Sequence, residues 1–400
     1  MTSRHVPFRD VELTPEDEQR CHDRAFQLID RTLRSYDERD GQGETIPRHH
    51  SILDNARWKL LKTNADASLY VERDSRSRRD LKLLGSDWEH PVVVMMAGTI
   101  RADLDEVMLG MSTPDFASLK VRTEALAKQP VDGAVLVDLM QPTEDDPFQA
   151  MAIQWTVLEP KWPVKAVVHP RDFVTLSSTG IMTRDNGDRI GYEVVLPADL
   201  RQCPPLAKPF VRGKFMHAAI FKQQEPGVVD VYVHAFVETQ NFILDKISVS
   251  MTWKSTIGVA TQLAEMKKLQ WCIAHCTSRR QQQQMAPSNS KACRKCFEKR
   301  VTSHRRSESS VEKHTCALCG SPTCSSCLEE RTLKISDERS IKLKERRVFV
   351  CRDCMTFVRQ QRPADIAREM LTQTQEQKEA EQSSSGSTAS SQGNHEPFTR

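Results

Sequence analysis

Residues 229–269 read VDVYVHAFVETQNFILDKISVSMTWKSTIGVATQLAEMKKL and contain two kinds of periodicity in direct succession. Over Val228–Thr239 and Lys246–Trp253 apolar and polar residues largely alternate, which predicts two β-strands. The spacing then changes, and the helix predicted over 256–283 has one apolar face. That face consists of Ile257, Val259, Ala260, Leu263, Met266, Leu269 and Ile273. This part of the chain therefore predicts sheet strands followed by a long helix.

The chain before this stretch begins with a predicted amphipathic helix over 15–35. Thr14 provides an N-cap, Pro15 occupies the first helical position, and acidic residues follow in the first turn. Its apolar stripe is expected to be Ala25, Phe26, Leu28, Ile29 and Leu33. Two shorter helices are predicted over 101–112 and 116–128, the second capped by Asp115 or Thr113.

Strand-like runs fill most of the remaining sequence. They are Ser68–Arg73, Val92–Ile100, Val131–Met140, Ala152–Leu158, Ala166–Ile181, Ile190–Leu196 and Val211–Lys222. Several alternate between apolar and polar residues and are bounded by Gly, Pro, Asp or Asn. The order is a helix, many strands with a helical insertion, and a long terminal helix. That order predicts an α+β fold with an antiparallel sheet, because α/β proteins alternate strands and helices.

Composition and charge point to an intracellular chain of more than one module. The 400 residues have a net charge of +3, but the segment 291–362 carries 18 Lys and Arg against 9 Asp and Glu. No run of 18 apolar residues is present, and the first 20 residues contain no signal-peptide pattern. We therefore expect a cytoplasmic protein, in which the 12 cysteines indicate metal binding more than disulfides.

A short motif in the sheet region resembles a known lipid-binding family. Arg171-Asp172-Phe173, within HPRDFVTLSSTG, is similar to the strand motif of START domains, and residues 229–269 resemble the way in which those domains end. The resemblance covers residues 12–275 and implies a helix-grip fold with an internal tunnel for one lipid. Arg171 and Asp172 are the candidate lipid-cavity residues, although the two could equally form an ordinary ion pair. Four aromatic residues could line a pocket but are more often core: Trp155, Trp162, Trp253 and Phe215.

Eight of the cysteines fall between residues 293 and 354 and form four Cys-x-x-Cys pairs. They are Cys293/Cys296, Cys316/Cys319, Cys324/Cys327 and Cys351/Cys354. Each pair directs two thiolates at one metal, and four thiolates complete a closed tetrahedral zinc site. The sequence therefore predicts two structural zinc ions with no open coordination position for hydrolytic chemistry.

The spacing of the pairs also predicts how they share the two ions. Only four residues separate Cys319 from Cys324, which is too short for the two middle pairs to share one zinc comfortably. We expect an interleaved arrangement, in which the first and third pairs bind one zinc and the second and fourth pairs bind the other.

The cysteine region resembles a second family. Residues 313–320, KHTCALCG, with the four-residue spacing to Cys324 and the outer pairs, are similar to FYVE zinc fingers. The resemblance implies a two-zinc, cross-brace finger of the FYVE/PHD type that binds phosphatidylinositol 3-phosphate on endosomal membranes. The candidate phosphoinositide-binding residues are Lys313, His314, Arg346 and Arg347. The sequence departs from the family in two places: the Trp-x-x-Asp motif before Cys293 is absent, and the basic motif is reduced to Lys-His.

These observations predict four regions in the chain. They are a START-like domain over 12–275, a Gln/Ser-rich linker over 276–290, a FYVE-like finger over 291–360, and a mostly disordered tail over 361–400. The expected protein is a non-enzymatic lipid-binding protein, peripheral at endosomal membranes, with a lipid and an anionic membrane surface as partners.

Several alternatives remain open at this level. The large domain could be an interaction scaffold with a filled cavity. The finger could belong to a RING-type ubiquitin ligase, since RING domains also interleave two zincs, but their usual Cys-x-His step is missing. No nucleic-acid partner is expected, because base-reading helices and stacking aromatics are lacking. Motifs of hydrolases, metalloproteases and nucleotide-binding enzymes are absent. The oligomeric state is not indicated.

Overall fold

The computed structural model describes most of the large domain and the greater part of the cysteine-rich region. The described residues are 6–8, 11–40, 56–73, 88–89, 91–127, 131–159, 162, 164–166, 168–238, 249, 253, 258–275, 293, 296, 315–335 and 343–372. Of the predicted strand Lys246–Trp253, only residues 249 and 253 are described, and both are helical; the other residues lie outside the described ones. None of the described helices is both long enough and apolar enough to cross a membrane.

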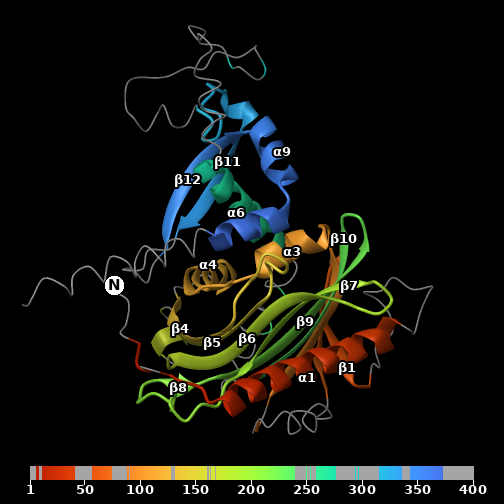
Figure 1. Ribbon diagram of the computed structural model, residues 1–400, viewed down its shortest axis with the longest axis vertical. Coiled ribbons are helices and arrows are strands. Elements are labelled where there is room, and N and C mark those ends of the chain that lie inside the picture. Colours follow the sequence, from red (N-terminus) through yellow and green to blue (C-terminus); the bar gives the residue numbers. More distant parts are fainter. Residues whose placement is uncertain are drawn as a thin grey trace, which may run out of the picture.

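A large antiparallel sheet forms the centre of the molecule (Figure 1). Its strands are β1 (Trp58–Thr63), β2 (Ala67–Glu72), β3 (Val92–Ile100), β4 (Val131–Met140), β5 (Ala150–Leu158), β6 (Arg171–Thr183), β7 (Arg189–Pro197), β8 (Val211–Arg212), β9 (Lys214–Glu225) and β10 (Val228–Glu238). They lie in the order β1-β2-β3-β10-β9-β7-β6-β5-β4, and β8 pairs in parallel with β6. The predicted α+β class is confirmed, whereas the sequence analysis missed the edge strand β1.

Helix α1 (Pro15–Asp40) covers one face of this sheet (Figure 1). The backbone N–H of Asp17 donates to Oγ1 of Thr14 over 3.2 Å, so the predicted N-cap is confirmed. The buried stripe consists of Ala25, Leu28, Ile29, Thr32 and Tyr36. Phe26 is 68% exposed and was wrongly placed in the apolar stripe, because it lies one residue, or about 100°, away from Ala25 on the helix.

Helices α3 (Leu104–Met111), α4 (Phe116–Ala127) and α6 (Val259–His275) lie on the opposite face of the sheet (Figure 1). The N–H of Ser118 donates to Oδ1 of Asp115 over 2.7 Å, which confirms Asp115 as the cap of α4. Helices α3 and α6 approach each other closely at Gly110. A Cβ at this position would lie 1.9 Å from the carbonyl oxygen of Ala260. The absence of a side chain there allows the two helices to make their contact.

The cysteine-rich region packs directly on α6. It contains β11 (Leu328–Ile335), β12 (Lys344–Cys351) and α9 (Arg352–Gln360). One apolar cluster contains Leu269 and Cys272 of α6 together with Val348, Met355 and Val358 of the finger. A charged contact lies beside this cluster, where Arg331 and Arg359 donate to the two oxygens of Glu265 over 2.8 and 2.9 Å. The finger and the long helix therefore share a core.

A further helical stretch follows α9 over residues 363–372. Its Ile366 is 1% exposed, and Ala367 belongs to the apolar cluster between the sheet and α3. The sequence analysis included these residues in the mostly disordered tail over 361–400, and within that region the structure shows a helix over residues 363–372. The stretch is mostly polar, so its few apolar residues, which include Ile366 and Ala367, did not predict a buried contact.

Candidate functional site

The first candidate site lies between α4 and the sheet. It is a cavity of about 240 Å³ whose walls come from α4, the α3–α4 loop and strands β4, β5, β6, β7, β9 and β10. Its lining residues are Thr113, Leu119, Arg122, Thr123, Leu126, Val131, Gln154, Thr156, Leu158, Phe173, Thr175, Ser177, Glu193, Val195, Phe215, His217 and Val237. The lining is largely apolar, with a cluster of hydroxyl groups and one set of charged groups.

Local periodicity explains why these residues face one space. In α4, Leu119, Arg122, Thr123 and Leu126 follow the i, i+3, i+4, i+7 spacing and therefore share one helix face. In the sheet the lining residues alternate along each strand, as do Phe173, Thr175 and Ser177 of β6. The residues between them, Val174 and Leu176, belong to the apolar cluster beneath α1 on the other face.

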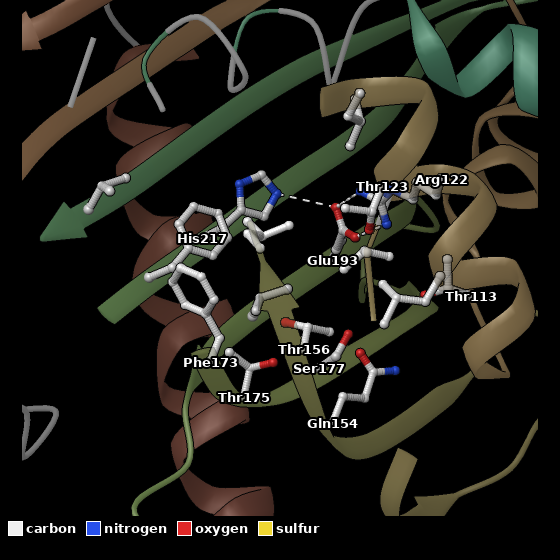
Figure 2. Close-up of a pocket in the computed structure, with 17 residues that line it drawn as sticks. Thr113, Arg122, Thr123, Gln154, Thr156, Phe173, Thr175, Ser177, Glu193 and His217 are labelled. Carbon is white, nitrogen blue, oxygen red and sulfur yellow. Dashed lines mark hydrogen bonds and ion pairs between the residues drawn. The ribbon is translucent and has the colours of Figure 1, made fainter. Parts of the chain in front are cut away.

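Three charged or titratable side chains meet at one wall of the cavity (Figure 2). Arg122 of α4 donates to both carboxylate oxygens of Glu193 of β7, with Nη2 2.8 Å from Oε2. A further hydrogen bond runs from Nη1 of Arg122 to the carbonyl oxygen of Met111 over 2.9 Å. Nε2 of His217 of β9 lies 3.2 Å from Oε2 of Glu193. The group joins three elements that are distant in the sequence.

Burial and charge oppose each other at Glu193. Its side chain is only 3% exposed, and burial alone would raise the pKa of this carboxyl. The Arg122 guanidinium and the His217 contact outweigh burial and lower the pKa of Glu193 to about 2. The wall of the cavity therefore contains a buried carboxylate that is ionised at neutral pH and is paired with Arg122.

The predicted lipid-cavity residues Arg171 and Asp172 do not line this cavity. Asp172 is fully buried and accepts hydrogen bonds from Nε and Nη2 of Arg212 over 3.0 and 2.9 Å. It lies on the strand face opposite to Phe173, which is why it cannot reach the cavity. Arg171 begins β6, and its Nη1 donates to the carbonyl oxygen of His169 over 2.7 Å. Neither Arg171 nor Asp172 therefore contributes to the wall of this cavity.

Of the four aromatic residues that the sequence offered as pocket residues, one lines the cavity and three lie elsewhere. Phe215 lines the cavity, whereas Trp155 packs edge-on against Phe8 in the cluster beneath α1. Trp162 is 84% exposed, and Trp253 packs at the edge of the cluster between the sheet and α3.

The eight cysteines of the finger form the second candidate site. The structure brings their Sγ atoms together in two groups, each within 4.8 Å: Cys293, Cys296, Cys324 and Cys327, and Cys316, Cys319, Cys351 and Cys354. These groups combine the first pair with the third and the second pair with the fourth, as the interleaved arrangement predicts. None of the described cysteines forms a disulfide.

The geometry of each group fits a tetrahedral zinc ion. Four sulfurs at the usual Zn–S distance of about 2.3 Å lie about 3.8 Å from one another. The Sγ atoms of Cys296 and Cys324 are 3.8 Å apart, and those of Cys319 and Cys351 are 4.0 Å apart. Hydrogen bonds with Cys316 and Cys319 raise the pKa of Cys354. Four thiols so close together do not all ionise without a cation to balance their charge.

The predicted phosphoinositide residues are only partly described. Lys313 and His314 lie outside the described residues. Arg346 and Arg347 are exposed on β12, and Arg347 lies 3.7 Å from Glu330 of the neighbouring strand β11. Both arginines are therefore open to solvent on the finger.

The sequence analysis missed Arg122, Glu193 and His217. A signal for Glu193 was available, because it is a charged residue within the apolar strand Ile190–Leu196. A charged residue at such a position is rarely buried unless it is paired, so this pattern indicates that Glu193 has a charged partner. The partner was not identifiable, because Arg122 is 71 residues away in the chain.

Comparison with known proteins adds a similarity to solved structures. No protein-family model matches the chain, and no curated protein matches it. The human StAR-related lipid transfer protein 5 is 14% identical, with a TM-score of 0.38 over 60% of this chain and 96% of that chain. Human STARD10 is 14% identical, with a TM-score of 0.36 over 55% and 78%. A STAR-related lipid transfer protein fragment from Xanthomonas axonopodis is 13% identical, with a TM-score of 0.32 over 52% and 98%.

Proposed function

We propose that the chain is a non-enzymatic lipid-binding protein that is anchored by a two-zinc finger. In this proposal the large domain holds one lipid in the cavity beneath α4, and the finger docks the protein on an anionic membrane. The observation that carries the proposal is the buried Arg122–Glu193–His217 group at the wall of a largely apolar cavity. An amphiphile has the matching division into a polar headgroup and an apolar remainder.

The cavity offers separate surroundings for the two parts of such a ligand. Leu119, Leu126 and Leu158 supply apolar surface for a hydrocarbon part. The hydroxyls of Thr156, Thr175 and Ser177, together with the charged group, supply hydrogen-bonding partners for a headgroup. A ligand carbonyl or hydroxyl beside Arg122 would receive a charge-assisted hydrogen bond, which is stronger in a buried site than in water.

In the proposal the two cysteine groups bind two structural zinc ions. Each group would supply four thiolates and leave no coordination position for water or substrate. The ions would provide folding energy that a small domain with few buried residues otherwise lacks. They would also secure β12 and α9, since Cys351 ends the strand and Cys354 lies in the helix.

We further propose that the finger binds membranes containing an anionic phosphoinositide, with phosphatidylinositol 3-phosphate the first to be tested. This proposal is supported by the excess of Lys and Arg over 291–362 and by the exposure of Arg346 and Arg347. A Lys or Arg near an anionic leaflet contributes about 1 kcal/mol. Lys313 and His314 complete the candidate set, which would place the protein peripherally on endosomal membranes.

Native mass spectrometry of the full-length chain tests lipid and zinc binding together. We expect the mass of one lipid and two zinc ions. Thr175→Phe would fill the cavity and remove the lipid, whereas Thr183→Phe, on an exposed part of the same strand, would retain it. Retention of lipid by the Thr175→Phe protein, with both zincs present, would contradict the proposed cavity.

Vesicle flotation tests the proposed binding of the finger to membranes. The Arg346→Ala/Arg347→Ala protein should lose binding to phosphatidylcholine vesicles that contain phosphatidylinositol 3-phosphate. The matched control removes Arg20 and Arg34, two exposed arginines of α1, and should bind as the unmodified protein does. Equal binding to phosphatidylserine vesicles of the same charge would assign the effect to charge alone.

One observation favours an interaction scaffold as the second candidate. The cavity of about 240 Å³ is smaller than the 300–1,000 Å³ that is usual for ligand sites. In a scaffold the Arg122–Glu193 pair would only stabilise the fold. Two bound zincs with no lipid, both in the purified protein and after incubation with a lipid extract, would support this alternative.

A further inference from the structure

A second chamber lies on the far side of the α3–α4 loop from the cavity. It has a volume of about 280 Å³. Its lining residues are Leu109, Ser112, Pro114, Asp115, Phe116, Val135, Asp138, Gln141, Pro147, Lys267, Ala367, Met370 and Leu371. A narrow hollow lies between the two spaces. It shares Thr113, Gln154 and Ser177 with the cavity, and Pro114, Asp138 and Gln141 with the second chamber. The two spaces are therefore neighbours, separated by this hollow of about 10 Å³.

One wall of the second chamber comes from outside the large domain. Ala367, Met370 and Leu371 belong to the helical stretch over residues 363–372, which we call the latch helix. It is the unlabelled dark-blue helix near α3 and α4 in Figure 1. It follows α9 of the finger after two residues, Gln361 and Arg362. The finger thus supplies the element that closes a space in the large domain.

The latch helix has two buried side chains, Ile366 and Ala367. Ala364 packs partly against the same apolar cluster, and the other residues of the helix are half-buried or exposed. On its outer side, Nε1 of Trp271 donates to Glu369 over 2.9 Å, and Nε of Arg368 donates to the carbonyl of Glu144 over 2.7 Å. A helix of this length is marginal by itself. Elements with small buried area open locally while the rest of the protein stays folded.

The chamber is lined by a buried lysine, Lys267, whose chemical labelling would detect such opening. The ammonium group of Lys267 donates to the carbonyl oxygens of Leu109 and Ser112 over 2.8 and 2.6 Å, at the end of α3. Burial lowers the pKa of Lys267 to about 8, although Asp115 partly opposes this shift. A lysine amine is acylated only when the reagent can reach it, and in the closed structure this amine is buried. Its acylation therefore measures access to the chamber.

We propose that the latch helix opens as a unit and uncovers the second chamber, and that the narrow hollow widens with this opening. The cavity then has a second mouth that accepts the hydrocarbon chain of an amphiphile. The passage of a ligand rests on the proposed lipid binding, whereas the opening of the latch helix does not. The competing interpretation is that residues 363–372 are a permanent part of the core that separates only on global unfolding.

Hydrogen exchange of the unmodified full-length protein tests the opening directly. Amides of residues 363–372 should exchange at least about tenfold faster than those of α9, which directly precedes them. Equal protection of the two segments, at the level of the strand β10, would overturn the latch.

Acylation of Lys267 by N-hydroxysuccinimidyl acetate, followed by peptide mass spectrometry, tests access to the chamber. Ala367→Glu places a carboxylate in the buried contact and should raise the labelling rate of Lys267 by about tenfold or more. Thr372→Glu adds the same charge on the exposed side of the same helix and should leave the rate unchanged. Exposed Lys59 is the internal reference. An unchanged rate in the Ala367→Glu protein would overturn the proposal.

Two further measurements keep the test decisive. The zinc content of each variant shows whether the finger remains folded. Trp271→Phe removes the hydrogen bond to Glu369 and keeps an aromatic ring beside His275, so it replaces Ala367→Glu if that variant does not fold. The loss of co-purified lipid to empty phosphatidylcholine vesicles should be faster from the latch variant than from the Thr372→Glu control. Equal loss would overturn the second mouth. If no lipid co-purifies, the ligand passage falls together with the proposed function, and Lys267 labelling still decides the latch.

Discussion

Arg122 and Glu193 form a bidentate ion pair that joins helix α4 to strand β7 at the wall of a buried cavity. The pair is almost wholly enclosed, with side-chain exposures of 11% and 3%. A buried carboxylate is costly unless it is paired, so each partner depends on the other for its charged state.

Removing one member of this pair should destabilise the protein strongly. Glu193→Gln leaves the Arg122 guanidinium buried without its counter-charge, and we expect a loss of about 3–5 kcal/mol in the free energy of unfolding. Replacing both residues by leucine should recover most of this loss, because no unpaired charge then remains. Urea denaturation measures the three proteins. A Glu193→Gln protein as stable as the unmodified chain would contradict the ion pair.

The same pair predicts a pH dependence. The pKa of Glu193 is lowered from 4.5 to about 2, so its contribution to stability is complete above pH 4.5 and is lost as the pH falls through 2. The Glu193→Leu/Arg122→Leu protein lacks this contribution. Its stability should fall less steeply between pH 4.5 and pH 2 than that of the unmodified chain, and parallel pH curves would argue against the assignment.

The interleaved cysteine groups predict which double substitutions share a zinc ion. Cys316→Ser/Cys351→Ser removes two ligands from one group and should leave one zinc bound. Cys293→Ser/Cys316→Ser damages both groups and should leave none. Native mass spectrometry counts the ions in both proteins. The opposite result would mean that the cysteines pair differently.

The contact between the finger and α6 predicts coupled unfolding. Glu265 accepts hydrogen bonds from both Arg331 and Arg359, which lower its pKa although burial opposes them. Glu265→Arg places three cations together and should lower the free energy of unfolding by about 1–3 kcal/mol. Calorimetry should then resolve two thermal transitions in place of one. Glu16→Arg, at an exposed position of α1, is the control and should keep a single transition.

The close approach of α3 and α6 predicts an effect of one methyl group. Gly110→Ala would place a Cβ 1.9 Å from the carbonyl oxygen of Ala260, so the helices must separate, at a cost of about 1–3 kcal/mol. Gly258→Ala, at a position with nothing within 4 Å, should change stability by less than about 0.5 kcal/mol. Thermal denaturation compares the two, and equal melting temperatures would contradict the packing.

Much of this protein was determined by patterns within short stretches of the sequence. Alternation predicted strands such as Val228–Thr239, helical spacing predicted α1, α4 and α6, and the Cys-x-x-Cys spacing predicted both the pairs and their interleaving. These features depend on neighbours within a few residues, which the sequence displays directly.

Tertiary structure alone decided where distant elements meet. Arg122, Glu193 and His217 lie on three elements, and only the strand order brings them to one wall. Asp172 faces away from the cavity although Phe173 lines it, because the register fixes which face of β6 is inward. The docking of the finger and of residues 363–372 onto the large domain depends on packing between surfaces far apart in the chain. Periodicity indicates that a face is apolar, but not which partner covers it.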